Sequence, residues 1–456
     1  MGSYRPSSPV CFNSCSFPDR SDIMNDASPA VSPVPHLMTS LTGPLLQLEA
    51  QLLQRQVAIE GWFRDQFRAT PAPLYCSVDL RNAGFKLAPV DTNLFPAGFN
   101  NLGERSLPLC VQAMQNAIER VCPRSCGVLL IPESHTRNLF YLESVAVLRR
   151  ILESAGYEVR IGSLIEGLAQ PQTLSLPSGA SLCLEPLRRE GDRVGVAGFD
   201  PCFVLLNNDL SAGRPAILEG LAQPIVPALA LGWSQRRKSV HFGHYRDVAR
   251  EFGARIELDP WLIDPYFRQC GEVDFLAREG EECLAGNVEV LLESIRLKYR
   301  EYGIDREPFV IIKADAGSYG MGVMTARSVD DVRDLNRKER KRMAASKDSQ
   351  AVRQVIMQEG VYTFETVGDP PAVAEPVVYM IDQHVVGGFY RVHTGRGADE
   401  NLNAPGMYFE PLAFVEPCNT PDGGQAPDAA PNRFYAYGVV ARLALLAAAR
   451  EMAAYG

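Results

Sequence analysis

A lysine followed by a group of glycines stands out as a possible phosphate-binding segment. The apolar run 309–312 ends at Lys313, and Gly317, Gly320 and Gly322 follow before a second apolar pair. Backbone N–H groups of a glycine loop can donate to phosphate oxygens, and a lysine at a strand end adds a fixed positive charge. The spacing Gly-x-x-Gly-x-Gly is neither the dinucleotide fingerprint nor the P-loop pattern. The segment therefore predicts either a hairpin that covers a triphosphate or an ordinary glycine-rich hairpin.

A second segment, residues 75–103, mixes aromatic residues and glycines with many short polar side chains. A pocket for a small zwitterionic molecule needs this mixture, whereas a solvent-exposed loop rarely contains it. An elaborate network of buried turns is the alternative interpretation. The candidate substrate-binding residues in this segment are Arg81, Lys86, Asp91, Asn93, Asn100 and Asn101. Asp79 is a further charged residue of the segment.

Two further polar groups lie between these segments. The apolar run 203–206 ends at residues 207–209, which read Asn-Asn-Asp, and the carboxyl ends of strands are where open α/β sheets bind ligands. Residues 233–241 form a basic cluster that contains Arg236. We interpret this cluster either as an anion-binding group, with Arg236 as a substrate-binding candidate, or as a solvated surface.

The composition limits the class of protein. The chain has 456 residues, 46% hydrophobic and 22% charged, with a formal net charge of −9. This acidic balance argues against general binding to nucleic acids or anionic membranes. The eleven cysteines show no disulfide or zinc framework, which is typical of reduced thiols in the cytoplasm. The most apolar segment, 435–454, is interrupted by charged residues, so no membrane-spanning helix is expected.

Hydrophobic patterns divide the chain into three parts. Residues 1–37 lack apolar periodicity and are predicted to form a disordered extension. Residues 38–245 begin with an amphipathic helix over 41–68 and predict an N-terminal α/β region that binds the substrate. Residues 246–456 predict a second region of antiparallel strands and helices. The predicted fold class is α/β (α+β).

The second region is expected to hold the nucleotide. After the strand that ends at Lys313 come the glycine loop, another strand and a basic helix over 331–347. The strand 355–361 contains a polar pair, Gln358 and Glu359, that could bind an adenine edge. Two further strands, a loop that begins at Glu400 and a final helix over 434–454 complete the pattern.

The order of these elements resembles that of the ATP-grasp ligases, the superfamily of glutathione synthetase. More narrowly, the chain from Met38 on is similar to the proteobacterial-type glutamate–cysteine ligases. The segments DLRNAGFKLAPVDTNLFPAGFNNL, IPESHTRNLFYLESV, IIKADAGSYGMGVM and NLNAPGMYFEPL carry this resemblance. It implies that ATP phosphorylates the γ-carboxylate of glutamate and that the amine of cysteine attacks the acyl phosphate, as the first step of glutathione biosynthesis.

The resemblance also implies roles for individual residues. Lys313 and Arg391 would be catalytic, because they place positive charge on the phosphates and on the oxyanion. The implied ATP-binding residues are Lys313, Gly317, Ser318, Tyr319, Gly320, Met321, Gly322, Gln358, Glu359 and Val361. The implied Mg²⁺ ligands are the hard oxygen donors Glu400, Asn401 and Asn403.

Two other functions remain open from the sequence. A kinase that stops at a phosphorylated carboxylate or alcohol would use the same ATP-binding half without an amine. A nucleotide-sensing protein would bind ATP without turnover. The sequence does not indicate an oligomeric state.

Overall fold

The computed structural model describes residues 37–38, 43–124, 127–134, 137–317, 322–344, 352–411 and 433–455. Except for Leu37, the predicted extension 1–37 lies outside these ranges. The described residues combine three main sheets with helices, so the mixed α/β fold with antiparallel sheets that the sequence predicts is confirmed.

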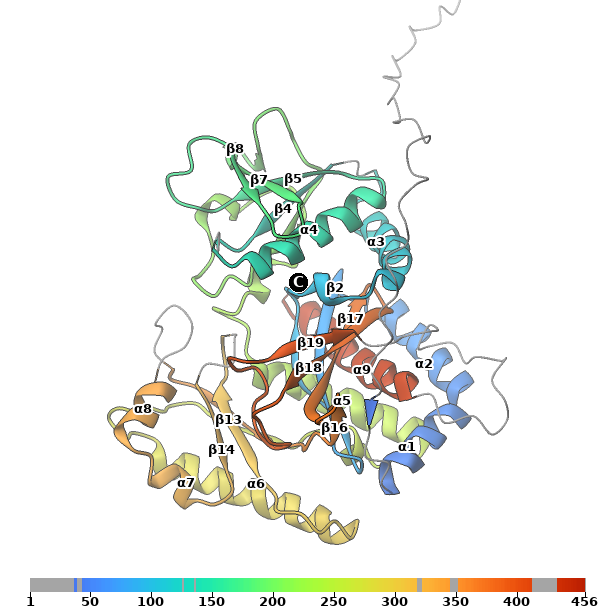
Figure 1. Cartoon of the computed structure of the whole chain (residues 1–456), viewed down its shortest axis with the longest axis vertical. Helices are drawn as coiled ribbons and strands as arrows, with labels where there is room; N and C mark the ends of the chain where they lie inside the picture. Colours follow the sequence, from blue (N-terminus) through green and yellow to red (C-terminus); the bar gives the residue numbers. More distant parts are fainter. Residues whose placement is uncertain are drawn as a thin grey trace, which may run out of the picture. The chain divides into compact units, whose positions relative to one another are not determined.

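The N-terminal α/β part forms a six-stranded sheet with the order β11-β10-β4-β5-β7-β6. Its strands are β4 (Gly127–Pro132), β5 (Glu158–Ser163), β6 (Gln172–Ser175), β7 (Ser181–Pro186), β10 (Phe203–Asn207) and β11 (Ile225–Val226). All neighbours pair in parallel except β6 with β7. The helices α3 (Leu107–Val121) and α4 (Leu139–Ser154) pack on each other, and α4 contacts β5 and β7 (Figure 1). A separate hairpin around Gly191 is formed by β8 (Arg188–Glu190) and β9 (Arg193–Gly195).

The segment around Lys313 lies in a four-stranded antiparallel sheet with the order β12-β15-β13-β14. Its strands are β12 (Phe267–Cys270), β13 (Val310–Ala314), β14 (Val323–Ala326) and β15 (Val355–Glu359). The helix α6 (Glu281–Glu301) contacts β12, β13 and β15. The predicted order of strand, glycine-containing connection and strand is therefore confirmed.

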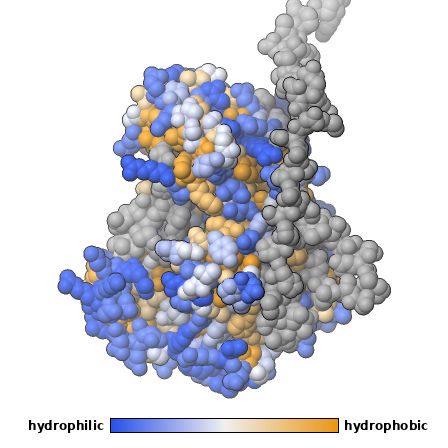
Figure 2. Space-filling view, viewed as in Figure 1, coloured by the Kyte–Doolittle hydropathy of each residue, from blue (hydrophilic) through white to orange (hydrophobic). Residues whose placement is uncertain are grey.

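The sequence predicts one continuous basic helix over 331–347, and this prediction is wrong. The structure has two short helices, α7 (Asp330–Arg333) and α8 (Arg337–Met343). Asn336 separates them, because its extended backbone and its side-chain oxygen cap the first turn of α8. Figure 2 shows that the region where Figure 1 labels these helices is mostly hydrophilic.

The third sheet has seven antiparallel strands that come from both ends of the described chain. Its strands are β1 (Leu37–Met38), β2 (Tyr75–Asn82), β3 (Leu87–Asn93), β16 (Glu365–Val367), β17 (Ala372–Ile381), β18 (His384–His393) and β19 (Tyr408–Pro411). The order is β1-β16-β17-β18-β19, while β2 pairs with both β17 and β3. This pairing places strands that are about 300 residues apart side by side.

Four helices lie near this seven-stranded sheet. They are α1 (Gly43–Gln54), α2 (Gln56–Ala69), α5 (Lys238–Ile256) and α9 (Arg433–Ala453). The helix α9, predicted from the sequence, contacts β2, β3 and β17, and α5 packs against α9 (Figure 1). The single helix predicted over 41–68 is interrupted at Arg55, whose backbone leaves the helical region with ψ of 9°. None of the helices in the described ranges is long and apolar enough to cross a membrane.

The predicted boundary between residues 245 and 246 falls inside α5. The described residues from 37 onward also belong to one compact unit. The division into a substrate region and a nucleotide region thus stays a prediction.

A buried ion pair ties α9 to the start of α5. Arg236 donates from Nε and Nη2 to the two carboxylate oxygens of Glu451, at 2.8 and 2.9 Å. The side chains are 1% and 0% exposed, and Arg236 Nη1 also donates to the carbonyl oxygen of Thr92 on β3 at 2.7 Å. His241 Nδ1 lies 3.2 Å from Glu451 Oε2. This cluster therefore fixes β3 relative to two helices.

The buried pair predicts a large loss of stability in Glu451→Ala. Arg236 would keep a buried charge without its carboxylate, which costs about 3–5 kcal/mol of unfolding free energy. Glu251→Ala is the matched control, because it removes the half-exposed partner of Arg450 and should cost less than about 1 kcal/mol. Urea unfolding of both variants measures the difference. Equal losses in the two variants would contradict the role given to the buried pair.

Candidate active site

One face of the seven-stranded sheet gathers polar side chains from four strands. Alternate residues of a strand point to the same face, and residues in register lie side by side. The register places Asp79 of β2 between Asp91 of β3 and Val377 of β17. One row further along, Glu375 of β17 lies beside Arg391 of β18. The pairing thus brings the candidates Asp91 and Arg391 to a common surface.

Arg391 is held by two carboxylates on this face. Its Nη1 donates to Asp79 Oδ2 at 2.9 Å and to Glu375 Oε1 at 2.5 Å. Glu375 Oε2 accepts from Arg81 Nε at 2.9 Å, so one carboxylate lies between two guanidinium groups. Burial lowers the pKa of Arg391, but the charges of Asp79 and Glu375 outweigh it and raise the pKa above its ordinary value. Within the described residues, the buried Nε of Arg391 has no hydrogen-bond partner.

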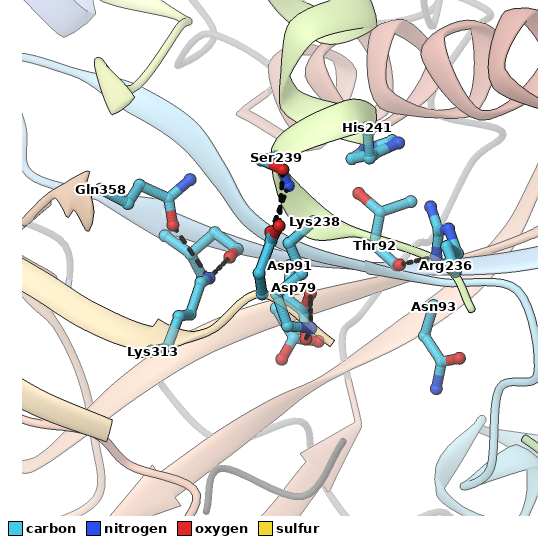
Figure 3. A network of polar contacts seen from close by, with 12 residues as sticks. Asp79, Asp91, Thr92, Asn93, Arg236, Lys238, Ser239, His241, Lys313 and Gln358 are labelled. Atoms are coloured by element: carbon cyan, nitrogen blue, oxygen red, sulfur yellow. Dashed lines mark hydrogen bonds and ion pairs between the residues drawn. The ribbon is translucent and has the colours of Figure 1, made fainter. Parts of the chain in front are cut away.

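Lys313 faces the same region from β13. Its Nζ donates to the carbonyl oxygen of Val90 at 2.6 Å and to Gln358 Oε1 at 3.0 Å (Figure 3). Burial lowers the pKa of Lys313 to about 8, although the charge of Asp91 opposes this shift. Lys238 Nζ lies 3.0 Å from Asp91 Oδ1. Burial raises the pKa of Asp91, but the charges of Lys238 and Lys313 outweigh it and the pKa lies below its ordinary value.

A cavity of about 140 Å³, which we call the Lys313 cavity, lies between the four-stranded and seven-stranded sheets. Both predicted catalytic residues line it. The other predicted site residues in its lining are Arg81, Asp91, Gln358, Glu359, Val361, Asn401 and Asn403. The structure therefore brings together candidates from the two predicted regions of the chain.

A second cavity, of about 430 Å³, continues on the same face and is called here the aromatic cavity. Its acidic and amide residues are Asp79, Asp91, Asn93, Asn101, Glu133, Asn138, Asn207, Asp209 and Asn403. Its aromatic residues are Phe95, Phe140, Tyr141, Trp233, Tyr379, Phe389 and Phe409. Among the described lining residues, Arg391 is the one cation. Residues that follow β4 and β10 line it, as expected for the carboxyl ends of these strands.

The two cavities meet at four residues. Asp79, Asp91, Arg391 and Asn403 line both of them. A molecule in one cavity can therefore approach a molecule in the other at the carboxylates and the guanidinium group of this junction.

A larger cavity, of about 790 Å³, lies beside Gly317. Its basic residues are already paired, since Arg237 Nε donates to Gln354 Oε1 at 3.0 Å and Arg353 Nη1 to Asp274 Oδ2 at 2.7 Å. Gly317 is the one predicted site residue in its described lining. Gly322 is at the other end of the predicted loop and has a positive φ of 63°. The predicted residues Ser318, Tyr319, Gly320 and Met321 lie outside the described residues.

Three predicted substrate residues do not line the described cavities. Lys86 Nζ is buried and donates to Asp264 O and Glu359 Oε2, each at 2.9 Å. Arg236 is occupied by the buried pair with α9. Asn100 Oδ1 is buried and lacks a partner within the described part of the chain. Substrate contacts of Lys86 and Arg236 would require their buried pairs to open.

The predicted metal ligands do not form one group. The carboxylate of Glu400 accepts from Arg396 Nη1 at 2.8 Å and from Gly397 N at 2.7 Å. Asn401 Oδ1 accepts from Asn403 N at 3.0 Å, and only these two asparagines line the Lys313 cavity. In the ranges that the structure describes, no three His, Cys, Asp or Glu side chains are placed to hold a metal ion. The protein alone thus provides an incomplete set of ligands.

Two residues that hold side chains of the junction were not predicted from the sequence. Glu375 holds Arg81 and Arg391, and Lys238 holds Asp91. A carboxylate within the apolar strand β17 was the available signal for Glu375, because a buried charge is rarely found without a partner. Lys238 lay inside the basic cluster, where no pattern distinguished it from its neighbours.

Comparison with known proteins decides the family. A sequence model described as glutamate-cysteine ligase matches residues 49–452. The chain belongs to the glutamate–cysteine ligase family. A crystal structure from Methylobacillus flagellatus KT, provisionally named a gamma-glutamylcysteine synthetase, is 61% identical and has a TM-score of 0.85. The similarity covers 93% of this chain and 99% of that chain.

Membership in this family gives the chain its activity. It is an ATP-dependent ligase that forms γ-glutamylcysteine, the first step of glutathione synthesis. Its substrates are therefore small molecules.

Two other solved structures are much less similar to this chain. A glutathione synthetase-like effector from Globodera pallida is 10% identical, with a TM-score of 0.37 over 83% of this chain and 85% of that chain. D-alanyl-alanine synthetase A from Vibrio cholerae O1 biovar eltor is 8% identical, with a TM-score of 0.33 over 70% and 81%. A comparison with curated proteins found no match.

A phosphate-binding role for Lys313 predicts that the ligase loses ATP affinity in alkaline solution, because burial lowers the pKa of this side chain. Because the ammonium of the free enzyme loses its proton near pH 8, the KM for ATP should rise by about tenfold for each pH unit well above 8. Lys313→Arg keeps its charge over this range and should give a flat profile. Initial rates between pH 7 and 9.5 measure both profiles, and thermal melting checks the fold. Parallel profiles would contradict a phosphate-binding role for Lys313.

Proposed function

We propose that the ligase works in the manner of the ATP-grasp enzymes, with ATP in the Lys313 cavity and glutamate and cysteine in the aromatic cavity. The observation that supports this assignment is the junction of the two cavities at Arg391 and Asp79. A phosphoryl group can pass to a carboxylate only if both lie within contact distance, and this junction provides that approach.

The proposed reaction has two steps. An oxygen of the γ-carboxylate of glutamate attacks the terminal phosphorus of ATP, the bond from that phosphorus to its bridging oxygen breaks, and ADP leaves. The neutral amine of cysteine then attacks the carbonyl carbon of the acyl phosphate, and inorganic phosphate leaves as the amide bond forms. No covalent enzyme nucleophile takes part in either step.

Arg391 stabilises the negative charge that develops at the junction. Its Nη1 is held by Asp79 and Glu375, and its unpartnered Nε is a donor for an oxygen of the transferred phosphoryl group or of the tetrahedral intermediate. A preorganised cation of this kind requires no reorientation during the reaction. Lys313 binds the phosphates from the opposite side of the cavity.

Asp79 is placed to hold the amine of cysteine. Burial raises the pKa of its carboxyl group, although the charge of Arg391 opposes this shift. A carboxylate with a raised pKa at the junction can accept one of the protons that the ammonium group gives up.

Adenine would lie near Gln358, Glu359 and Val361. The backbone there is largely paired, because the N–H of Glu359 donates to Tyr266 O at 2.7 Å and that of Gly360 to Phe309 O at 2.8 Å. Gln358 has a buried Nε2 without a partner among the described residues. Gln358 is therefore the stronger candidate for a polar contact to the base.

Mg²⁺ is proposed to enter together with ATP. Mg²⁺ is commonly bound by phosphate oxygens, water and few protein ligands, which agrees with the incomplete set in the Lys313 cavity. Asn401 and Asn403 are the proposed ligands there, and Glu400 could join them only after releasing Arg396. When bound, the ion neutralises charge on the phosphates.

We place the enzyme in the cytoplasm, as its scattered cysteines suggest, and without nucleic-acid or membrane partners, as its net charge of −9 suggests. The kinase and the nucleotide sensor are the functions against which the proposal is tested.

Arg391→Lys and Arg391→Ala test the role of the junction. Both variants should lower the cysteine-dependent release of ADP by about a hundredfold or more, with a smaller effect on ATP binding, because an oxyanion-stabilising donor is lost. Arg391→Lys retains a charge between the two carboxylates and guards against unfolding. Arg296→Ala, which removes a surface cation from α6, is the control and should leave the rate unchanged.

The same assay separates the rival functions. The wild-type enzyme should release little ADP with glutamate alone and should release it rapidly, with a γ-linked dipeptide, once cysteine is added. Full release without cysteine would favour the kinase, and ATP binding without turnover would favour the sensor.

A further inference from the structure

The lining of the aromatic cavity combines two kinds of side chains. The polar ones come from the carboxyl end of β10 and from the segments after β4 and β10: Glu133, Asn138, Asn207 and Asp209. The lining also carries apolar side chains from α4, β18 and β19. Glutamate keeps an ammonium and a carboxylate group after its γ-carboxylate is placed at the junction, and these groups require polar side chains.

The apolar side chains form a continuous wall of aromatic rings. Phe140 stacks on Phe409 with ring centroids 5.6 Å apart, and Phe409 meets Phe389 edge-on at 4.9 Å. Phe389 lies 5.4 Å from Tyr379. Met407 adds a thioether to the lining. We call Phe140, Phe389, Met407 and Phe409 the aromatic wall.

The wall borders the reaction centre at Arg391. Phe389 is two positions before Arg391 on β18 and therefore points to the same face of the sheet. Phe409 on β19 lies directly opposite Arg391 in the strand register. An amino acid whose amine reaches the acyl phosphate at Arg391 can thus place a short side chain against these rings.

We propose that the aromatic wall is the subsite for the side chain of the amine substrate and that it selects a thiol over a hydroxyl group. This inference rests on the proposed function, since it assumes that the aromatic cavity holds both amino acids. It assigns the choice of cysteine to named residues.

The selectivity follows from the chemistry of the wall. Sulfur makes favourable contacts with aromatic rings, and a thiol is a weak hydrogen-bond donor that loses little when it leaves water. The side chains of the wall contain only carbon and one thioether sulfur, so they cannot replace the hydrogen bonds that a hydroxyl group makes in water. The wall should therefore favour cysteine over serine and should tolerate a methyl group in place of the thiol.

The experiment compares cysteine, serine and 2-aminobutyrate as amines with glutamate and ATP. For the wild-type enzyme, kcat/KM should fall by about a hundredfold from cysteine to serine. With 2-aminobutyrate it should stay within about tenfold of the cysteine value, because one apolar group replaces another of similar size. Phe409→Asn should reduce the ratio of the kcat/KM values for cysteine and serine by about tenfold, since the amide of asparagine can form a hydrogen bond with the hydroxyl group of serine.

A second variant and a control complete the test. Phe140→Asn should change the ratio in the same direction, and because Phe140 is 49% exposed the substitution should not disturb the fold. Tyr408→Asn changes the exposed neighbour of Phe409 on β19 and should keep the wild-type ratio. The KM values for ATP and glutamate should remain those of the wild type in all three variants.

Several results would overturn the inference. The inference is wrong if the ratio of the kcat/KM values for cysteine and serine is unchanged in both wall variants. It is also wrong if the variants raise the KM for glutamate and leave the KM for cysteine unchanged. Failure of the proposed function gives a different result, because Arg391→Ala would then keep the wild-type rate with cysteine.

Discussion

The carboxylate of Glu375 lies between the guanidinium groups of Arg81 and Arg391, and the active site depends on this arrangement. Burying three charges is costly unless they are paired, and here each has a partner within 2.9 Å. Arg81 also donates to the carbonyl oxygens of Val361 and Glu400. The network therefore links the seven-stranded sheet to the segments that follow β15 and β18. Arg391 is therefore fixed before any ligand binds, which is the condition for stabilising charge during the reaction.

A second buried pair supports the other side of the site. Glu451 on α9 holds Arg236, and Arg236 donates to the carbonyl oxygen of Thr92. Thr92 follows Asp91, which lines both cavities. The last described helix thus positions a strand from the first quarter of the chain. Substitutions far from the cavities can therefore act on the site through β3.

Local patterns predicted much of the fold, and long-range pairing accounts for what they missed. Lys313 at a strand end and the strand that covers 203–206 follow from short sequence signals, and the structure confirms both elements. The bond from Arg391 to Asp79 spans 312 positions, so no local signal could place these two residues together. Lys86 was selected because it lies in a polar segment, yet it pairs with Glu359, a residue 273 positions away. Charge alone therefore does not distinguish residues that line a cavity from residues in buried pairs.

A crystal structure with a non-hydrolysable ATP analogue and glutamate bound would test the central claim most directly. The account predicts the triphosphate between Lys313 and Arg391 in the Lys313 cavity. It also predicts the γ-carboxylate of glutamate in the aromatic cavity, within hydrogen-bond distance of the Arg391 guanidinium group. Phosphates bound instead near Arg237 and Arg353, without contact to Lys313 or Arg391, would contradict it, because the nucleotide would then lie away from the junction.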